Sequence, residues 1–201
     1  MIGLYVPDGL PVPPTVDRSE VGALVRDGAL LAVSDASENI SLSHSARSAV
    51  AVSFDTQRRC HIVRGAPDAA HGEGAGIVAS LDLLTRAPDD IRRVLVSDQN
   101  YLDSTRFWII LAQRMNKCGD SERRMLGEVI RRAQNGALDN TVFVCASSHF
   151  GPHDTARHAM QAADLLAKRV RKGTPMTVAG AVRRITRSAH READTIIGAS
   201  D

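Results

Sequence analysis

The sequence predicts an α/β protein in which five short strands are interspersed with helices. Apolar runs of strand length recur along the chain, and two of them end in an aspartate, Asp35 and Asp98. In the segments between the later runs, apolar residues lie three or four positions apart, which is typical of one helix face. With 201 residues, 43% of them hydrophobic, the chain is long enough to bury a core.

Three strands are expected first. Residues 28–36, GALLAVSDA, form an apolar run that ends in an acid, and the polar stretch after it predicts a loop. Two further runs, AVAVSF at 49–54 and CHIV at 60–63, are separated by DTQRR, a pattern that predicts a hairpin. Together these strands would form an antiparallel meander.

The remaining elements alternate between helices and two strands. GEGAGIVASLDLLTRA predicts a helix with Glu73 in its first turn, and RVLVSD repeats the pattern of a strand that ends in an acid. Two consecutive helices follow, the second of them rich in arginine, and then a fifth strand and a long helix. The predicted ranges are 72–87, 93–98, 101–116, 121–134, 141–146 and 155–172.

The two ends of the chain differ from this central domain, which we place at residues 28–172. Residues 1–27 contain four prolines, which disfavour a continuous helix or a central strand, so we expect an N-terminal extension. Residues 173–201 begin with a Thr174-Pro175 helix start and predict a basic amphipathic helix.

Charge and cysteine content narrow the class of partner and compartment. Residues 1–100 carry 9 Lys or Arg against 13 Asp or Glu, whereas residues 101–201 carry 16 against 10. An acidic half that could hold cations and a basic half that could hold phosphates suit a polyanionic partner, although solvated helix faces would have the same composition. Three cysteines and no apolar run of about 20 residues indicate an intracellular, reducing location, cytoplasmic or nuclear, and no membrane partner.

Four acidic segments, in order, resemble the type 1 ribonuclease H family. LAVSDAS is similar to the first strand of that family, HGEGAGIVASLDLL to the helix that carries its glutamate, and VLVSDQNYL to its fourth strand. VFVCASSHFG and AADLLAKR resemble the last strand with its histidine loop and the helix that bears the last aspartate. The resemblance covers roughly residues 28–172. It implies a five-stranded mixed sheet, with three antiparallel strands and then two parallel ones, flanked by helices.

The resemblance also implies a metal-dependent endonuclease that cuts the RNA strand of RNA:DNA hybrids. Two Mg²⁺ (or Mn²⁺) ions, held by carboxylates, would activate water and stabilise the departing oxygen. Taken singly, the acids have simpler explanations as turn residues or helix-dipole partners. As a set they predict a metal centre at the edge of the sheet. The expected ligands, also expected to be catalytic, are Asp35, Glu73, Asp98 and Asp164.

A histidine on the loop after the fifth strand completes the predicted catalytic set. By resemblance, His149 would assist proton transfer or product release, with His153 as the alternative. A zinc site that includes Cys145 is a further alternative, but a strand cysteine would point away from the loop. A plain surface histidine loop is the simplest explanation.

Several departures from the family leave the substrate open. The asparagine usually found one turn before the last aspartate is Met160 here, and no basic insertion separates the two middle helices. A DNA nuclease or junction resolvase, or a noncatalytic module that binds nucleic acid or protein, is therefore an alternative to hybrid cleavage. The C-terminal helix could join a larger replication or retroelement assembly. The residues expected to bind substrate are Gln99, Asn100, Arg123, Arg124 and Arg131.

Overall fold

The structure is a computed structural model that describes residues 10, 12–37, 48–54, 60–64, 69–99, 107–171 and 187. Its described elements belong to the α/β class. In chain order they are η1 (Arg18–Glu20), α1 (Val21–Arg26), β1 (Leu30–Ser37), β2 (Ser48–Phe54), β3 (Cys60–Arg64), α2 (Ala69–Leu84), β4 (Arg93–Ser97), α3 (Phe107–Lys117), α4 (Asp120–Gln134), β5 (Thr141–Cys145) and α5 (Thr155–Arg171).

The sheet has the strand order β3-β2-β1-β4-β5. Strands β1, β4 and β5 run parallel, while β2 pairs antiparallel with both β1 and β3. The parallel strands read as continuous apolar runs because both of their faces are covered by helices, and all five residues of β4 are buried. The carboxyl ends of β1, β4 and β5 therefore meet at one edge of the sheet.

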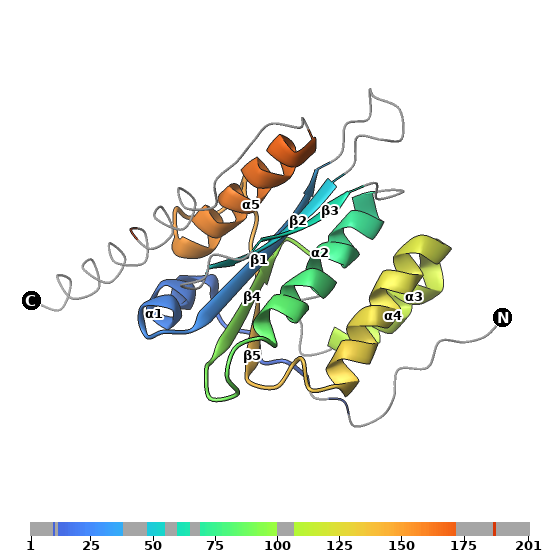
Figure 1. The fold of residues 1–201 in the computed structure, drawn as a ribbon, viewed down its shortest axis with the longest axis horizontal. Helices are drawn as coiled ribbons and strands as arrows, with labels where there is room; N and C mark the ends of the chain where they lie inside the picture. Colours follow the sequence, from blue (N-terminus) through green and yellow to red (C-terminus); the bar gives the residue numbers. More distant parts are fainter. Residues whose placement is uncertain are drawn as a thin grey trace, which may run out of the picture.

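Helices cover the two faces of the sheet unequally. Figure 1 shows α1 and α5 on one side and α2, α3 and α4 on the other. On the α5 side, Leu31 and Val33 pack with alanines of that helix, whose small side chains let it lie close to the strands. On the other side, Leu30 and Ala32 pack with larger side chains, among them Ile77.

Helix α2 begins at Ala69, three residues before the predicted start. Glu73 consequently lies in the second turn and not in the first, so the expectation of a first-turn acid beside the helix dipole was wrong. An alanine pair extends the helix toward its N-terminus, and no acidic residue occupies the first turn. The helix dipole therefore does not explain why an acid occupies position 73.

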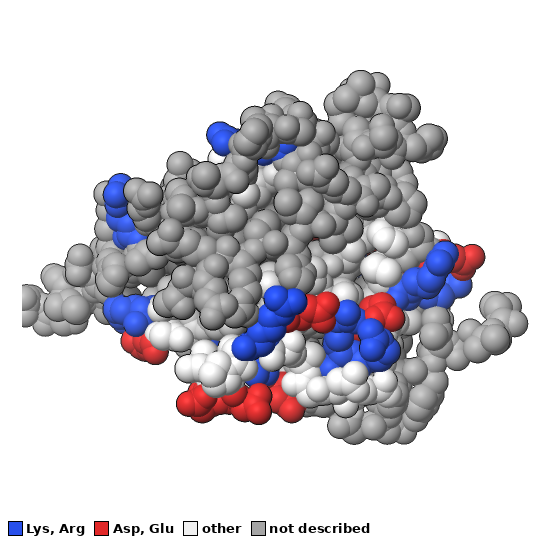
Figure 2. Space-filling view, in the orientation of Figure 1, with Lys and Arg blue, Asp and Glu red and all other residues white. Residues whose placement is uncertain are grey.

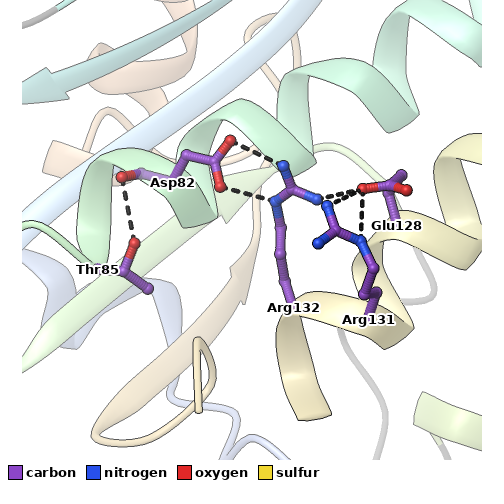
Figure 3. A network of polar contacts seen from close by, with 5 residues as sticks. All are labelled: Asp82, Thr85, Glu128, Arg131 and Arg132. Atoms are coloured by element: carbon purple, nitrogen blue, oxygen red, sulfur yellow. Dashed lines mark hydrogen bonds and ion pairs between the residues drawn. The ribbon is translucent and has the colours of Figure 1, made fainter. Parts of the chain in front are cut away.

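A network of ion pairs joins α2 to α4. Arg132 on α4 donates to both carboxylate oxygens of Asp82 on α2, at 2.7 and 3.0 Å, and it also pairs with Glu128. Arg131 donates to the same Glu128, as Figure 3 shows. In Figure 2 the blue and red side chains of described residues lie next to one another over the lower part of the view, in keeping with such pairing.

Part of the expected N-terminal extension packs on the sheet domain. Val21 of α1 is fully buried in the core beneath α5, with Leu24 and Val25 beside it. Further upstream, Thr15 forms a parallel bridge to Phe143 at the edge of β5. The predicted C-terminal helix lies outside the described residues apart from Arg187. Among the described helices, none combines the length and the apolar content required to cross a bilayer.

Candidate metal centre

Three carboxylates converge at the edge of the sheet where the parallel strands end. Oxygens of Asp35, Glu73 and Asp98, one from each residue, all lie within 4.8 Å of one another. They come from β1, from α2 and from the residue that follows β4. Three of the four acids predicted as metal ligands are thus brought together by elements far apart in the sequence.

Strand register explains why two of these acids meet. Strands β1 and β4 pair in parallel up to Val33 opposite Val96, so the next positions of the same register place Asp35 opposite Asp98. Because side chains alternate between the faces of a strand, both acids share the face of Val33 and Val96, which is covered by α5. Strand β1 continues past the end of β4, and this leaves Asp35 at the margin of the core.

Asp35 is almost fully buried, with 7% of its surface exposed. Burial, together with the neighbouring charges of Asp98 and Asp164, raises the pKa of its carboxyl from 3.8 to about 7. Lys168 acts in the opposite direction because its positive charge favours the carboxylate. Without a bound cation, therefore, this carboxyl carries its charge only partly near neutral pH.

Glu73 reaches the cluster from the opposite face of the sheet. Its Oε1 accepts a hydrogen bond of 3.2 Å from the backbone N–H of Ala36, whereas its Oε2 is buried and has no hydrogen-bond partner among the residues that the structure describes. Burial, together with the charges of Asp98 and Asp35, raises the pKa of this carboxyl to about 8. A buried oxygen without a partner is energetically costly, and a cation bound at the cluster would satisfy it.

A glycine next to Glu73 brings α2 close to α4. A Cβ added to Gly74 would lie 2.8 Å from the Cβ of Met125 on α4, closer than such atoms approach in proteins. Only glycine fits this helix contact without a shift. The GEG sequence therefore combines a carboxylate for the cluster with the close packing that holds its helix in place.

Asp98 is the exposed member of the cluster. Its Oδ1 accepts a hydrogen bond of 3.1 Å from the side-chain amide of Gln99, while the Gln99 backbone N–H donates to the Ser97 hydroxyl at 3.4 Å. Gln99, predicted to contact substrate, thus orients a carboxylate of the cluster. Asn100, predicted for the same role, lies outside the described residues.

The fourth predicted ligand, Asp164, does not belong to the three-carboxylate cluster. Its Oδ2 accepts a 2.7 Å hydrogen bond from Lys168, one turn further along α5. Its charge nevertheless raises the pKa of Asp35, so it lies close enough to interact with the site. The expected convergence of four acids is therefore observed for three, and the carboxylate of the fourth pairs with its neighbour on the helix.

His149 lies on the loop between β5 and α5 and is exposed. Its backbone N–H donates to the Ser147 hydroxyl at 3.1 Å, and its ring makes an edge contact with Phe150 at 6.4 Å between centroids. His153, the alternative, lies near His158 with 6.3 Å between ring centroids. Within the described ranges, only the acidic cluster brings three possible metal ligands together, so the zinc alternative is not supported there.

The arginines predicted to bind substrate are largely occupied by this protein's own groups. Arg123 donates to the carbonyls of Met115 and Cys118 and so caps the C-terminal end of α3. Arg131 pairs with Glu128, whereas Arg124 is exposed. For Arg123 the geometry indicates a structural role in the turn between two helices.

Sequence reasoning missed two cations that act on the cluster. Lys168 pairs with Asp164 and lowers the pKa of Asp35, and the positive charge of Arg114 on α3 lowers the pKa of Glu73. The spacing of Asp164 and Lys168, four residues apart on one helix, is a pattern that could have revealed the pair. No comparable sequence pattern links Arg114 to Glu73, because their proximity depends on how the helices pack.

The cluster fits a hard divalent cation. Carboxylate oxygens are the ligands that Mg²⁺ and Mn²⁺ prefer, and three of them lie close together here. One oxygen of Glu73 has no hydrogen-bond partner among the described residues, and the pKa values of Asp35 and Glu73 are raised. Both observations indicate that the negative charge of the cluster is not fully compensated by the protein. These three side chains could thus hold a metal ion.

Comparisons with known proteins support the fold. No protein-family model matches the chain, and a search of curated protein sequences finds no match. Among solved structures, the foamy viral protease-reverse transcriptase in complex with an RNA/DNA hybrid is similar, with a TM-score of 0.54 and 12% sequence identity. The match covers 85% of this chain and 22% of the viral chain. At this identity the likeness shows that the chain shares its fold with part of that viral protein.

Proposed function

We propose that this protein is a metal-dependent endonuclease that hydrolyses the RNA strand of RNA:DNA hybrids. The observation that carries the proposal is the meeting of Asp35, Glu73 and Asp98 at one sheet edge. The similar fold in a viral protein solved with an RNA/DNA hybrid supports the choice of substrate. The type 1 ribonuclease H resemblance of the sequence points in the same direction.

In this proposal the three clustered carboxylates would hold one Mg²⁺ or Mn²⁺ ion. Asp164, released from Lys168, would join Asp35 in holding a second. Bound divalent ions would stabilise negative charge on the attacking and departing oxygens of the phosphodiester. The chain itself supplies a preorganised set of acids, of which Asp98 is exposed, and their charged forms become favourable once cations are present.

Other residues act on protons and on orientation. Gln99 holds the carboxylate of Asp98 through its side-chain amide, which fixes the exposed member of the cluster. His149, exposed on the adjoining loop, would accept or deliver a proton at its imidazole nitrogens as the product leaves. Arg124, whose side chain is exposed, would contact substrate phosphates in a salt-sensitive way.

The test is cleavage of a labelled hybrid with Mg²⁺ or Mn²⁺ and with a chelator. We expect cleavage that the chelator abolishes and that Asp98→Asn lowers about a hundred-fold or more, because a carboxylate that would hold the charge-stabilising cation is lost. Asp98 is suitable because it is exposed and its replacement by asparagine leaves the core intact.

A matched control is Asp90→Asn, another exposed aspartate, in the turn that leads into β4 at the opposite end of that strand. This variant should cleave at the wild-type rate. No cleavage of the hybrid with either ion would overturn the proposal. Cleavage of duplex DNA or a four-way junction in preference to the hybrid would retain the nuclease chemistry but contradict the substrate.

A further inference from the structure

The loop between β5 and α5 exposes an aromatic ring. Phe150 is 77% exposed, more than any other described large hydrophobic residue, whereas Phe107 and Phe143 are each 1% exposed. A scattered exposed hydrophobic side chain needs no explanation by itself. Here the surrounding backbone and the position of the loop provide two independent reasons to assign Phe150 a role.

The backbone on either side of Phe150 is held by side chains of α5. Arg157 donates to the carbonyls of Gly151 and His149, at 2.6 and 3.1 Å. One turn further along the helix, the amide of Gln161 donates to the carbonyl of Ser148 at 3.2 Å. Two long polar side chains thus hold three backbone carbonyls of this exposed loop, two before Phe150 and one after it.

A second set of contacts holds the start and the end of the loop. The Ser147 hydroxyl accepts a hydrogen bond of 3.4 Å from the Phe150 backbone N–H. Arg18 donates to both carboxylate oxygens of Asp154, at 2.6 and 2.9 Å, and to the carbonyl of Pro152. Because the backbone is already ordered, a ligand that packs on the ring would pay little additional loop entropy.

The loop starts beside the carboxylate cluster. Cys145, the last residue of β5, is opposite Ser97 in the register, and the Ala146 N–H donates to the Ser97 carbonyl at 2.9 Å. Asp98 is the next residue after Ser97. The ordered loop that carries Phe150 therefore leaves the sheet at the same edge as the carboxylates, one strand away from Asp98.

We propose that Phe150 is a substrate-contacting residue, whose ring packs against the apolar face of a base or sugar in a nucleic acid bound at the cluster. This inference rests on the proposed function and names a contact within it. An aromatic face binds any base or sugar without reading sequence, which suits an enzyme that recognises backbone shape. The edge contact with His149 limits the orientations of the ring.

The test measures binding of a labelled RNA:DNA hybrid in chelator, in an Asp98→Asn background, so that cleavage does not interfere. Phe150→Ala should weaken binding about ten-fold, in keeping with aromatic contacts to nucleic acid. The dependence of the affinity on salt should stay unchanged, because an apolar contact releases no counterions. In the cleaving protein the same substitution should raise KM and leave kcat nearly unchanged.

Val12→Ala is the matched control. Val12 is also an exposed hydrophobic residue, at 48%, but it precedes the Thr15 bridge to β5 and so lies toward the amino end of that strand, away from the cluster. Its substitution should leave the affinity for the hybrid unchanged. A comparable loss with Val12→Ala would contradict a specific role for Phe150.

A spectroscopic variant tests the contact directly. Phe150→Trp combined with Trp108→Phe leaves one tryptophan, on the loop, and its emission should change when the hybrid is added. Unchanged emission, or equal affinity of Phe150→Ala and the parent, overturns the proposal. The proposal is also overturned if Phe150→Ala binds the hybrid normally but loses self-association. That outcome would assign the ring to a protein interface.

The outcomes separate this inference from the proposed function. If the hybrid is not cleaved but its binding depends on Phe150, the nuclease assignment fails and the contact stands. If the hybrid is cleaved with an unchanged KM after Phe150→Ala, the contact fails and the nuclease assignment stands.

Discussion

Two buried carboxyl groups of this protein, those of Asp35 and Glu73, have raised pKa values. Asp35 and Glu73 lie in a sparsely solvated site next to other acids, and their pKa values rise to about 7 and about 8. The charged forms are costly there unless a cation compensates them. Clustered acids whose charged forms are costly are typical of a binding site, because core packing alone would favour uncharged side chains at these positions.

The free energy of unfolding should depend on pH through these two carboxyl groups. Both pKa values are raised above the ordinary 3.8 and 4.5. At pH values between the ordinary and the raised pKa, the folded state therefore binds more protons than the unfolded state. The stability contributed by these groups is full below the ordinary values and is lost as the pH rises through about 7 and about 8. In chelator, urea denaturation should therefore show a less stable protein at pH 8 than at pH 6.

Glu73→Gln provides the comparison for this prediction. Because glutamine does not titrate, the variant should lose less stability than the wild type over the same pH interval. Added Mg²⁺ should stabilise the wild type more at the higher pH, where the carboxylates are already deprotonated, and should stabilise the variant less. Identical pH profiles for the two proteins would show that Glu73 does not titrate in this range.

At the level of elements, the loop between β5 and α5 depends on a glycine and an ion pair. Gly151 has a φ of +92°, a backbone conformation that favours glycine. A Cβ at this position would clash with Nη1 of Arg18, whose guanidinium is bound to Asp154. A side chain at position 151 would thus both strain the backbone and displace the arginine.

We expect Gly151→Ala to destabilise the protein by about 2 kcal/mol, measured by urea denaturation. Gly28→Ala is the control, since Gly28 has a similar φ of +93° but nothing within 4 Å of an added Cβ. The larger loss of unfolding free energy at position 151 would come from the displaced arginine, so the difference should disappear in an Arg18→Met background. Equal costs at the two glycines would mean that backbone strain accounts for the whole effect.

At the scale of the whole molecule, residues upstream of β1 contribute to the core. Val21 is fully buried beneath α5, and Arg18 ties the same segment to the start of that helix through Asp154. The proline content of residues 1–27 excludes a long regular element, but a short helix and one strand bridge need only a few residues. This segment therefore supports the helix that carries Asp164.

The corresponding prediction is a loss of stability on Val21→Ala. Removing two buried methyl groups and leaving a cavity should cost about 2 kcal/mol in the free energy of unfolding. Val12→Ala, at a position that is 48% exposed, should change the stability by less than about 0.5 kcal/mol. Similar small effects at both positions would show that the segment contributes little to the core.

The order and type of the elements from β1 to α5, and two of the three clustered acids, could be predicted from residue patterns alone. Apolar runs predicted strands β1, β4 and β5 because a strand buried on both faces must be apolar throughout. Asp35 and Asp98 were recognisable because an acid at the end of such a run violates this pattern. Glu73 required a resemblance to a family, since an acid near a helix start is common.

How the charges of the site are balanced depends on contacts between elements that are far apart in the sequence. Lys168 neutralises Asp164, Arg114 acts on Glu73, and Arg123 caps a helix. Packing between elements also explains why Phe150 is held outward on an ordered loop, through contacts that come from two helices. Periodicity reports which face of an element is buried, but partners in space depend on strand register and helix packing, which no local pattern encodes.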